Sequence, residues 1–165
     1  MVRKLVCLFV LCTTLSLKAE TPLVDSKNEL GLGFILGSPT ALSARKFLRD
    51  GHSVDLGFGY SWGNSLQGFA DYVFLFPNAW GDRDFKLTPF VGVGGALTLI
   101  LAGRKRSLDD DTETRTLTAA RFPLGISWWV PKSNVEIFAE IVPMIDVIPG
   151  LFPDFAGGIG FRIYI

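Results

Sequence analysis

The feature that most constrains this chain is a two-residue alternation of bulky apolar side chains with small or polar ones. The clearest case lies between residues 53 and 62, where Val54, Leu56, Phe58, Tyr60 and Trp62 alternate with Ser53, Asp55, Gly57, Gly59 and Ser61. Successive side chains of a β-strand point to opposite faces, so this period predicts a strand with one apolar face and one polar or small face.

The same pattern predicts eight strands, near residues 29–37, 41–48, 53–62, 67–76, 87–101, 116–130, 135–142 and 155–165. Clusters of Gly, Pro, Asn, Asp and Ser separate them, at 38–40, 49–52, 63–66, 77–86, 102–115, 131–134 and 143–154. Such connections suit an up-and-down meander. We therefore predict an all-β fold, an eight-stranded antiparallel up-and-down transmembrane β-barrel over residues 20–165.

Composition indicates a membrane as the solvent of this barrel. Only 19% of the residues are charged, where about 25% is typical of soluble domains, and the chain has 14 Phe and 18 Gly. In a bilayer, strands satisfy all backbone hydrogen bonds only when the sheet closes. About eight strands enclose an interior that side chains fill, so we expect no open aqueous channel.

Residues 87–103 carry no charge, and a transmembrane helix is the rival interpretation of this stretch. Pro89 and the glycines at 92, 94 and 95 disfavour a helix. Val91, Val93, Leu97 and Leu99 also alternate with small residues. A strand that faces lipid explains both observations.

Residues 1–19 have the layout of a secretory signal peptide, with Arg3 and Lys4, an apolar run from Leu5 to Leu11, and Ala19. The apolar run is shorter than the roughly 20 residues of a spanning helix; an uncleaved anchor is the alternative. Cleavage after residue 16 or 19 fits equally. Both cysteines, at 7 and 12, lie inside this segment, so we expect a mature protein without thiols, exported to the outer membrane of a Gram-negative-type bacterium.

The segment from Gly31 to Arg45, GLGFILGSPTALSAR, resembles the first hairpin of small outer-membrane barrels of spirochaetes and other Gram-negative-type bacteria, which are OmpA/OmpX-like transmembrane barrels. That family has a Gly-x-Gly run, then Gly-x-Pro-Thr-Gly, Ser and a basic residue; Ala41 replaces its last Gly. The carboxy-terminal residues 157–165 are similar to the signal that the barrel assembly machinery reads, carried here by Gly160, Ile163 and Ile165. This resemblance implies an outer-membrane barrel that contacts membrane lipid, lipopolysaccharide and, during biogenesis, the assembly machinery.

Charged residues at inward-facing positions of the predicted strands form a candidate network in the lumen: Arg45, Asp55, Asp71, Arg121, Glu136, Glu140 and Arg162. The set contains both signs, and buried charges persist only when they are paired and hydrogen-bonded. We interpret the network as packing of a filled interior. A proton or ion path is the alternative.

The predicted connection 102–115 is the most highly charged one, with Arg104, Lys105, Arg106, Asp109, Asp110 and Asp111. If the N-terminus emerges in the periplasm, odd-numbered strands run outward and this loop is extracellular. Its basic residues suit lipopolysaccharide phosphates or an extracellular ligand. The same orientation puts Trp62 at the outer rim, and Trp80, Trp128 and Trp129 at the inner rim, as aromatic girdles.

These features predict a non-enzymatic protein with a structural or surface-interaction role, without cofactor, metal or nucleic acid. Lys plus Arg equals Asp plus Glu at 16 each, so no basic excess exists for phosphate neutralisation, and a single histidine excludes a multi-histidine metal site. One alternative is a lipid-modifying enzyme using His52 with Asp50 or Asp55. The other is a soluble periplasmic lipocalin-like barrel, with its bulky residues inward around an apolar ligand.

Overall fold

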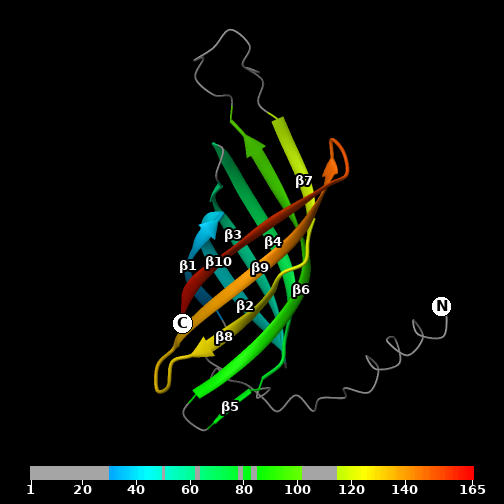
Figure 1. Cartoon of the computed structure of the whole chain (residues 1–165). Coiled ribbons are helices and arrows are strands. Elements are labelled where there is room, and N and C mark those ends of the chain that lie inside the picture. Colours follow the sequence, from blue (N-terminus) through cyan, green and yellow to red (C-terminus); the bar gives the residue numbers. More distant parts are fainter. Residues whose placement is uncertain (1–29, 50, 62–63, 78–79, 83–84, 102–114) are drawn as a thin grey trace, which may run out of the picture.

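The chain folds into a single antiparallel sheet that closes on itself (Figure 1). The computed structural model describes residues 30–49, 51–61, 64–77, 80–82, 85–101 and 115–165. Its strands are β1 (Leu30–Ser38), β2 (Thr40–Arg49), β3 (His52–Ser61), β4 (Ser65–Leu75), β5 (Trp80–Asp82), β6 (Phe85–Ile100), β7 (Arg115–Arg121), β8 (Leu124–Trp129), β9 (Val135–Ile148) and β10 (Phe152–Tyr164). The predicted signal peptide, Asp50 and the charged loop at 102–114 lie outside the described residues.

Strand pairing follows chain order around the ring. β1 to β4 pair in sequence, β4 pairs with β6, and β10 pairs with both β9 and β1. One row of directly paired residues runs around the whole ring: Tyr164, Gly31, Arg45, Asp55, Asp71, Gly94, Arg121, Met144 and Asp154. The row leaves β10 at Tyr164 and returns to it at Asp154, ten residues earlier. Such a stagger is what tilted strands need in order to close.

The predicted alternation is confirmed in the described strands. On β3, Leu56, Phe58 and Tyr60 are exposed on the outer surface, whereas Ser53 and Asp55 are buried inside. Residues 87–100, for which a transmembrane helix was the rival interpretation, lie in strand β6, and their side chains alternate between more exposed and more buried. Among the described residues, no helix has the length and apolar character needed to cross a membrane.

The predicted strand 116–130 is wrong as a single element, because Phe122 and Pro123 divide it into β7 and β8. Pro123 has no N–H to give to the sheet, but its carbonyl accepts a hydrogen bond of 2.7 Å from the Gly92 N–H. β7 and β8 each pair with both β6 and β9, so the two pieces share one place in the ring.

The predicted break at 143–154 is also wrong, since β9 continues to Ile148 and β10 begins at Phe152. Pro143 lies within β9 opposite the interruption between β7 and β8, and its carbonyl accepts from the Phe122 N–H at 3.0 Å. In an antiparallel sheet the N–H and C=O of one residue point to the same neighbouring strand. Because the Pro143 carbonyl points to the interruption, the N–H that proline lacks would also have pointed there. The proline therefore removes no regular ladder bond.

The predicted connection 77–86 contains the short strand β5, which pairs with the start of β6. Three residues are too few to establish a two-residue period, so this strand had no signal in the sequence. The described residues therefore form ten strand elements where we predicted eight strands, through β5 and the division of one strand into β7 and β8.

Large inward side chains lie directly opposite glycines on the neighbouring strand. A methyl group on Gly160 would lie 2.4 Å from the ring of Phe138, its partner on β9. One on Gly94 would lie 2.2 Å from Oδ1 of Asp71, its partner on β4. The high glycine content therefore follows from a narrow interior that must hold bulky residues.

We call the end of the barrel where β1 begins the sealed end, and the end where β1 finishes the mouth. At the sealed end, the rings of Trp129 and Tyr164 lie 4.8 Å apart, and Phe47 lies 5.6 Å from Tyr164. Trp129 is buried inside, which corrects its predicted place in an outward aromatic girdle, because it shares the inward face with Ser127. The side chains of Trp62 and Trp80 lie outside the described residues.

Candidate functional site

Six of the seven charged residues predicted for the lumen are buried inside the barrel. They come from strands on all sides of the ring: Arg45 on β2, Asp55 on β3, Asp71 on β4, Arg121 on β7, Glu136 on β9 and Arg162 on β10. Cross-strand pairing brings them together, since Arg45 is the direct partner of Asp55 and Glu136 that of Arg162.

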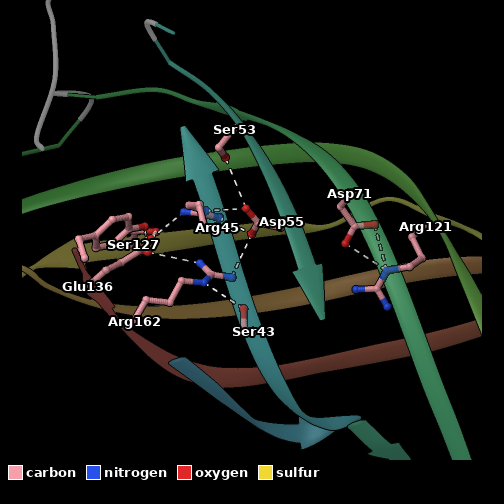
Figure 2. A network of polar contacts seen from close by, with 10 residues as sticks. Ser43, Arg45, Ser53, Asp55, Asp71, Arg121, Ser127, Glu136 and Arg162 are labelled. Atoms are coloured by element: carbon pink, nitrogen blue, oxygen red, sulfur yellow. Dashed lines mark hydrogen bonds and ion pairs between the residues drawn. The ribbon is translucent and has the colours of Figure 1, made fainter. Parts of the chain in front are cut away.

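Four of these residues form a closed ring of alternating charges (Figure 2). Arg45 donates to both carboxylate oxygens of Asp55 from Nε and Nη2, each at 2.7 Å, and from Nη1 to Glu136 Oε1 at 2.7 Å. Arg162 donates from Nη2 to Asp55 Oδ2 at 3.0 Å and from Nη1 to Glu136 Oε2 at 3.3 Å. Two positive and two negative charges thus balance, and every charge has two partners of opposite sign.

Hydroxyl groups add four further hydrogen bonds to this ring. Ser43 accepts from Arg162 Nε at 3.0 Å, and Ser53 donates to Asp55 Oδ1 at 3.4 Å. Ser127 donates to Glu136 Oε1, and the Tyr164 hydroxyl donates to Glu136 Oε2 at 2.6 Å. A buried ion pair is stable only when such additional bonds satisfy its other donors and acceptors.

A second, separate ion pair lies nearer the mouth (Figure 2). Arg121 Nε donates to the two oxygens of Asp71 at 3.1 and 3.2 Å, and its Nη1 lies 3.7 Å from the Met144 sulfur. The row of paired residues explains the contact: Asp71 and Arg121 flank Gly94, which has no side chain to separate them.

Each of the three buried arginines also has an aromatic ring beside it. The guanidinium carbon lies 3.9 Å from the Phe138 ring centre for Arg162, 4.0 Å from that of Phe69 for Arg121, and 5.1 Å from that of Phe90 for Arg45. Cation–π attraction is stronger when water is excluded, so these rings further hold the charges in place.

Glu140 is the predicted network member that the structure leaves outside both groups. Its side chain is half-buried, and it makes no hydrogen bond or ion pair with any described residue. Its direct partners on the neighbouring strands are Gly125 and Gly158, which bring no charge towards it. The alternation placed Glu140 on the correct face, but only the register reveals its neighbours.

Of the predicted assembly signal, Gly160 and Ile163 lie in the last part of β10 and Ile165 directly follows it. Gly160 provides the space for Phe138, whereas Ile163 and the terminal Ile165 point outward and are exposed. Of the predicted surface-loop residues, Arg104, Lys105, Arg106, Asp109, Asp110 and Asp111 all lie outside the described part of the chain.

His52 does not form the site that an enzyme would need with Asp55. The His52 ring lies at the sealed end on the outward face, where Nδ1 is 2.9 Å from the Tyr72 hydroxyl and the ring packs edge-on against Phe74. Asp55 points inward and is engaged by both arginines of the ring. Within the described ranges, no group of three or more His, Cys, Asp or Glu side chains is placed to hold a metal ion.

Sequence reasoning missed the polar and aromatic residues that support the charged ring and the Arg121–Asp71 pair, namely Ser43, Ser53, Ser127, Tyr164, Phe69, Phe90 and Phe138. All of them lie on the inward face, so the alternation contained a signal for them. We selected the seven candidate residues by their charge. Selecting every second residue of each strand instead would have identified all the side chains of the interior.

Comparisons with known proteins give one family and one similar structure. Residues 24–163 match the family described as "Protein of unknown function (DUF3996)". The structure is similar to the crystal structure of the N-terminal β-barrel domain of Pseudomonas aeruginosa OprF, with a TM-score of 0.61 and 16% sequence identity over 82% of this chain and 95% of that one. No curated protein sequence matches the chain. A likeness at this identity concerns the fold alone.

Proposed function

The chain belongs to the DUF3996 family of proteins of unknown function, and we propose that it is a non-enzymatic integral protein of the bacterial outer membrane. In this proposal the ring has eight strand positions, with β7 and β8 sharing one, and crosses the bilayer as a transmembrane barrel. Residues 1–19 act as the signal peptide, and the sealed end faces the periplasm.

The observation that carries the proposal is the inverted distribution of polarity. Leu36 is 68% exposed and Ile159 63% exposed on the outer surface, while Arg45, Glu136 and Arg162 are fully buried inside. In water this arrangement would expose a large apolar surface and bury charge, and both are unfavourable. In a bilayer the apolar surface is solvated by hydrocarbon, as in outer-membrane barrels. The same distribution argues against the soluble lipocalin-like alternative, which needs the bulky apolar side chains inside the barrel and the charged ones outside.

The filled interior favours a structural role over transport. The four-charge ring crosses the lumen, and Phe47, Trp129 and Tyr164 close one end. An ion would have to break several buried ion pairs to pass, which is costly. We therefore propose that the barrel anchors the chain in the membrane and contributes to envelope integrity, with no ion path through its centre.

The partners in this proposal follow from the surfaces. Membrane lipid and lipopolysaccharide contact the apolar outer face, and the assembly machinery recognises Gly160, Ile163 and Ile165. An extracellular ligand, if one is bound by the loop at 103–115, would meet its basic and acidic runs. Deletion of that loop should then abolish ligand binding while the barrel remains in the membrane.

The enzyme alternative has a direct test, because it requires His52. Lipid A should have the same mass spectrum in cells with the protein, in cells without it, and in cells with the His52→Ala variant. A lipid A species that depends on His52 would overturn the non-enzymatic proposal.

Location and closure are tested together with membrane fractions. We expect the protein to stay with the outer membrane after washing with high salt and alkaline carbonate, and to migrate faster on a gel before boiling than after it. A soluble periplasmic protein, followed in the same fractions, is the control. Release by salt together with unchanged gel mobility would overturn the proposal.

A further inference from the structure

The mouth of the barrel holds a polar pocket that the charged network does not use. Its volume is about 340 Å³, within the range of small-molecule sites. The side chains that carry the argument are Gln67 on β4, Thr98 on β6, Asp146 on β9 and Asp154 on β10, with Ser38 and Ser61 beside them. Met144 lies at the inner limit of the pocket, and the aromatic side chains close the opposite end of the barrel.

Gln67 gives this pocket an unfilled hydrogen-bonding position. The side chain is only 5% exposed; its Nε2 donates to Thr98 Oγ1 at 3.0 Å, and its Oε1 has no hydrogen-bond partner among the described residues. A buried acceptor without a partner costs stability. A ligand that donates a hydrogen bond within the pocket would remove this cost.

The two charged side chains among the described residues that line the pocket are both acidic. Asp146, half-buried, and Asp154, exposed, line the pocket from the mouth ends of β9 and β10, and Asp154 is two residues from Phe152, the direct partner of Asp146. Asp154 Oδ1 accepts from the Phe155 N–H at 2.7 Å, and no Lys or Arg is among the described residues that line the pocket. The nearby Arg121 is bonded to Asp71. Among its described lining residues, the pocket therefore presents two carboxylates and no Lys or Arg.

The remaining hydroxyls add hydrogen-bonding capacity but no positive charge. Ser38 and Ser61 lie 3.0 Å apart, Oγ to Oγ, at the ends of β1 and β3. Acceptor oxygens and negative charge together exclude anions and favour a cation with several N–H donors. A dehydrated metal ion fits less well, because Ca²⁺ requires six to eight oxygens at short range and this pocket is wide.

We propose that this pocket binds a small organic cation with two ammonium groups, of the aliphatic diamine class. One ammonium group lies between Asp146 and Asp154, and the other donates to Gln67 Oε1 and the adjacent hydroxyls. Binding needs only the folded barrel, so this inference goes beyond the proposed function. Only the side from which the ligand enters, the cell exterior, rests on the proposed orientation.

The test is calorimetric titration of the refolded mature chain in zwitterionic detergent with 1,4-diaminobutane. We expect saturable binding of one molecule per chain, and none of the neutral 1,4-butanediol. Asp146→Asn and Gln67→Met should each weaken binding by about tenfold, since each removes a hydrogen bond to a charged donor. Glu140→Gln removes the same charge as Asp146→Asn from outside the pocket, and should change the affinity less than twofold.

The inference would be overturned by no saturable heat with the diamine, by unchanged affinity in Asp146→Asn, or by an equal loss in Glu140→Gln. Tight binding of CaCl₂ that the diamine does not displace would also overturn it, in favour of a metal site. Unboiled gel mobility of every variant shows whether the barrel is folded. Because the titration uses folded protein in detergent, its failure leaves the membrane location, tested by fractionation, unaffected.

Discussion

Arg45 and Asp55 lie directly opposite each other on β2 and β3, and their side chains form two parallel hydrogen bonds of 2.7 Å. Neither residue has the other as its sole partner, because Arg45 also binds Glu136 and Asp55 also accepts from Arg162. The pair is therefore one side of a ring in which each charge compensates two others, and removing one member affects both of its neighbours.

Replacing Asp55 with Ala should lower the free energy of unfolding by about 3–5 kcal/mol, because it leaves two buried arginines without their shared carboxylate. The double variant Arg45→Met/Asp55→Leu should lose less than the sum of its two single variants, since Arg162 and Glu136 would still neutralise each other. Urea unfolding of the barrel refolded in lipid vesicles measures all of these. Additive losses would show that the ring does not act as a unit.

Neighbouring glycines on β6 should respond differently to a methyl group. In Gly94→Ala the new Cβ would lie 2.2 Å from both the Ala70 carbonyl oxygen and Asp71 Oδ1, so we expect a loss of about 1–3 kcal/mol in the free energy of unfolding. In Gly95→Ala the nearest atom, the Ala119 carbonyl oxygen, would be 3.5 Å away, and the loss should be below about 0.5 kcal/mol. The same urea titration checks both, and similar values would contradict the tight interior.

A charge on the outer surface should cost most in the middle of the barrel. Ile159 lies midway along β10 on the outward face, and Leu48, 52% exposed, lies near the end of β2. We expect Ile159→Arg to lower the free energy of unfolding in bilayers by about 2–4 kcal/mol and Leu48→Arg by about 0–1 kcal/mol. Equal costs at the two depths would argue against hydrocarbon around this surface.

The outward isoleucines at the end of β10 should matter for assembly in cells more than for stability. Ile163→Ser/Ile165→Ser should reduce the heat-modifiable form in the outer membrane, while refolding in vitro stays close to that of the matched pair Ile141→Ser/Ile145→Ser on β9. That matched pair also removes two exposed isoleucines, and should assemble normally in cells. If both pairs fail equally in cells, the terminus has no special role.

The alternation of side chains was enough to predict the facing of most residues, because period two is a local property of a strand. It placed Arg45, Asp55 and Arg162 inside and Phe58 and Ile159 outside, as the structure shows. The partners of each charge depend on register, which joins residues far apart in the sequence, such as Arg45 and Glu136. For that reason the sequence could not separate Asp71 and Arg121 from the ring of four, or leave Glu140 aside.

The strand ends were predicted less well wherever a proline lay near them. Pro143 was predicted to lie in a break, yet strand β9 continues through it. The interruption at Pro123 lies beside Pro143, so the neighbouring strand needs no hydrogen bond from an N–H at residue 143. Pro123 and Pro143 are therefore tolerated because they lie beside each other, at a place where the ladder of hydrogen bonds is already interrupted. A pattern that examines one strand at a time cannot detect such compensation between neighbours.

The row of paired residues returns to β10 with an offset of ten residues, and this offset restricts which insertions and deletions the sequence can tolerate. All strands share one continuous lattice, so an extra codon inside β6 would turn every later side chain of that strand inside out and misalign both of its neighbours. Length variation in descendants of this sequence should therefore accumulate in the connections, and frame-preserving insertions within strands should be eliminated.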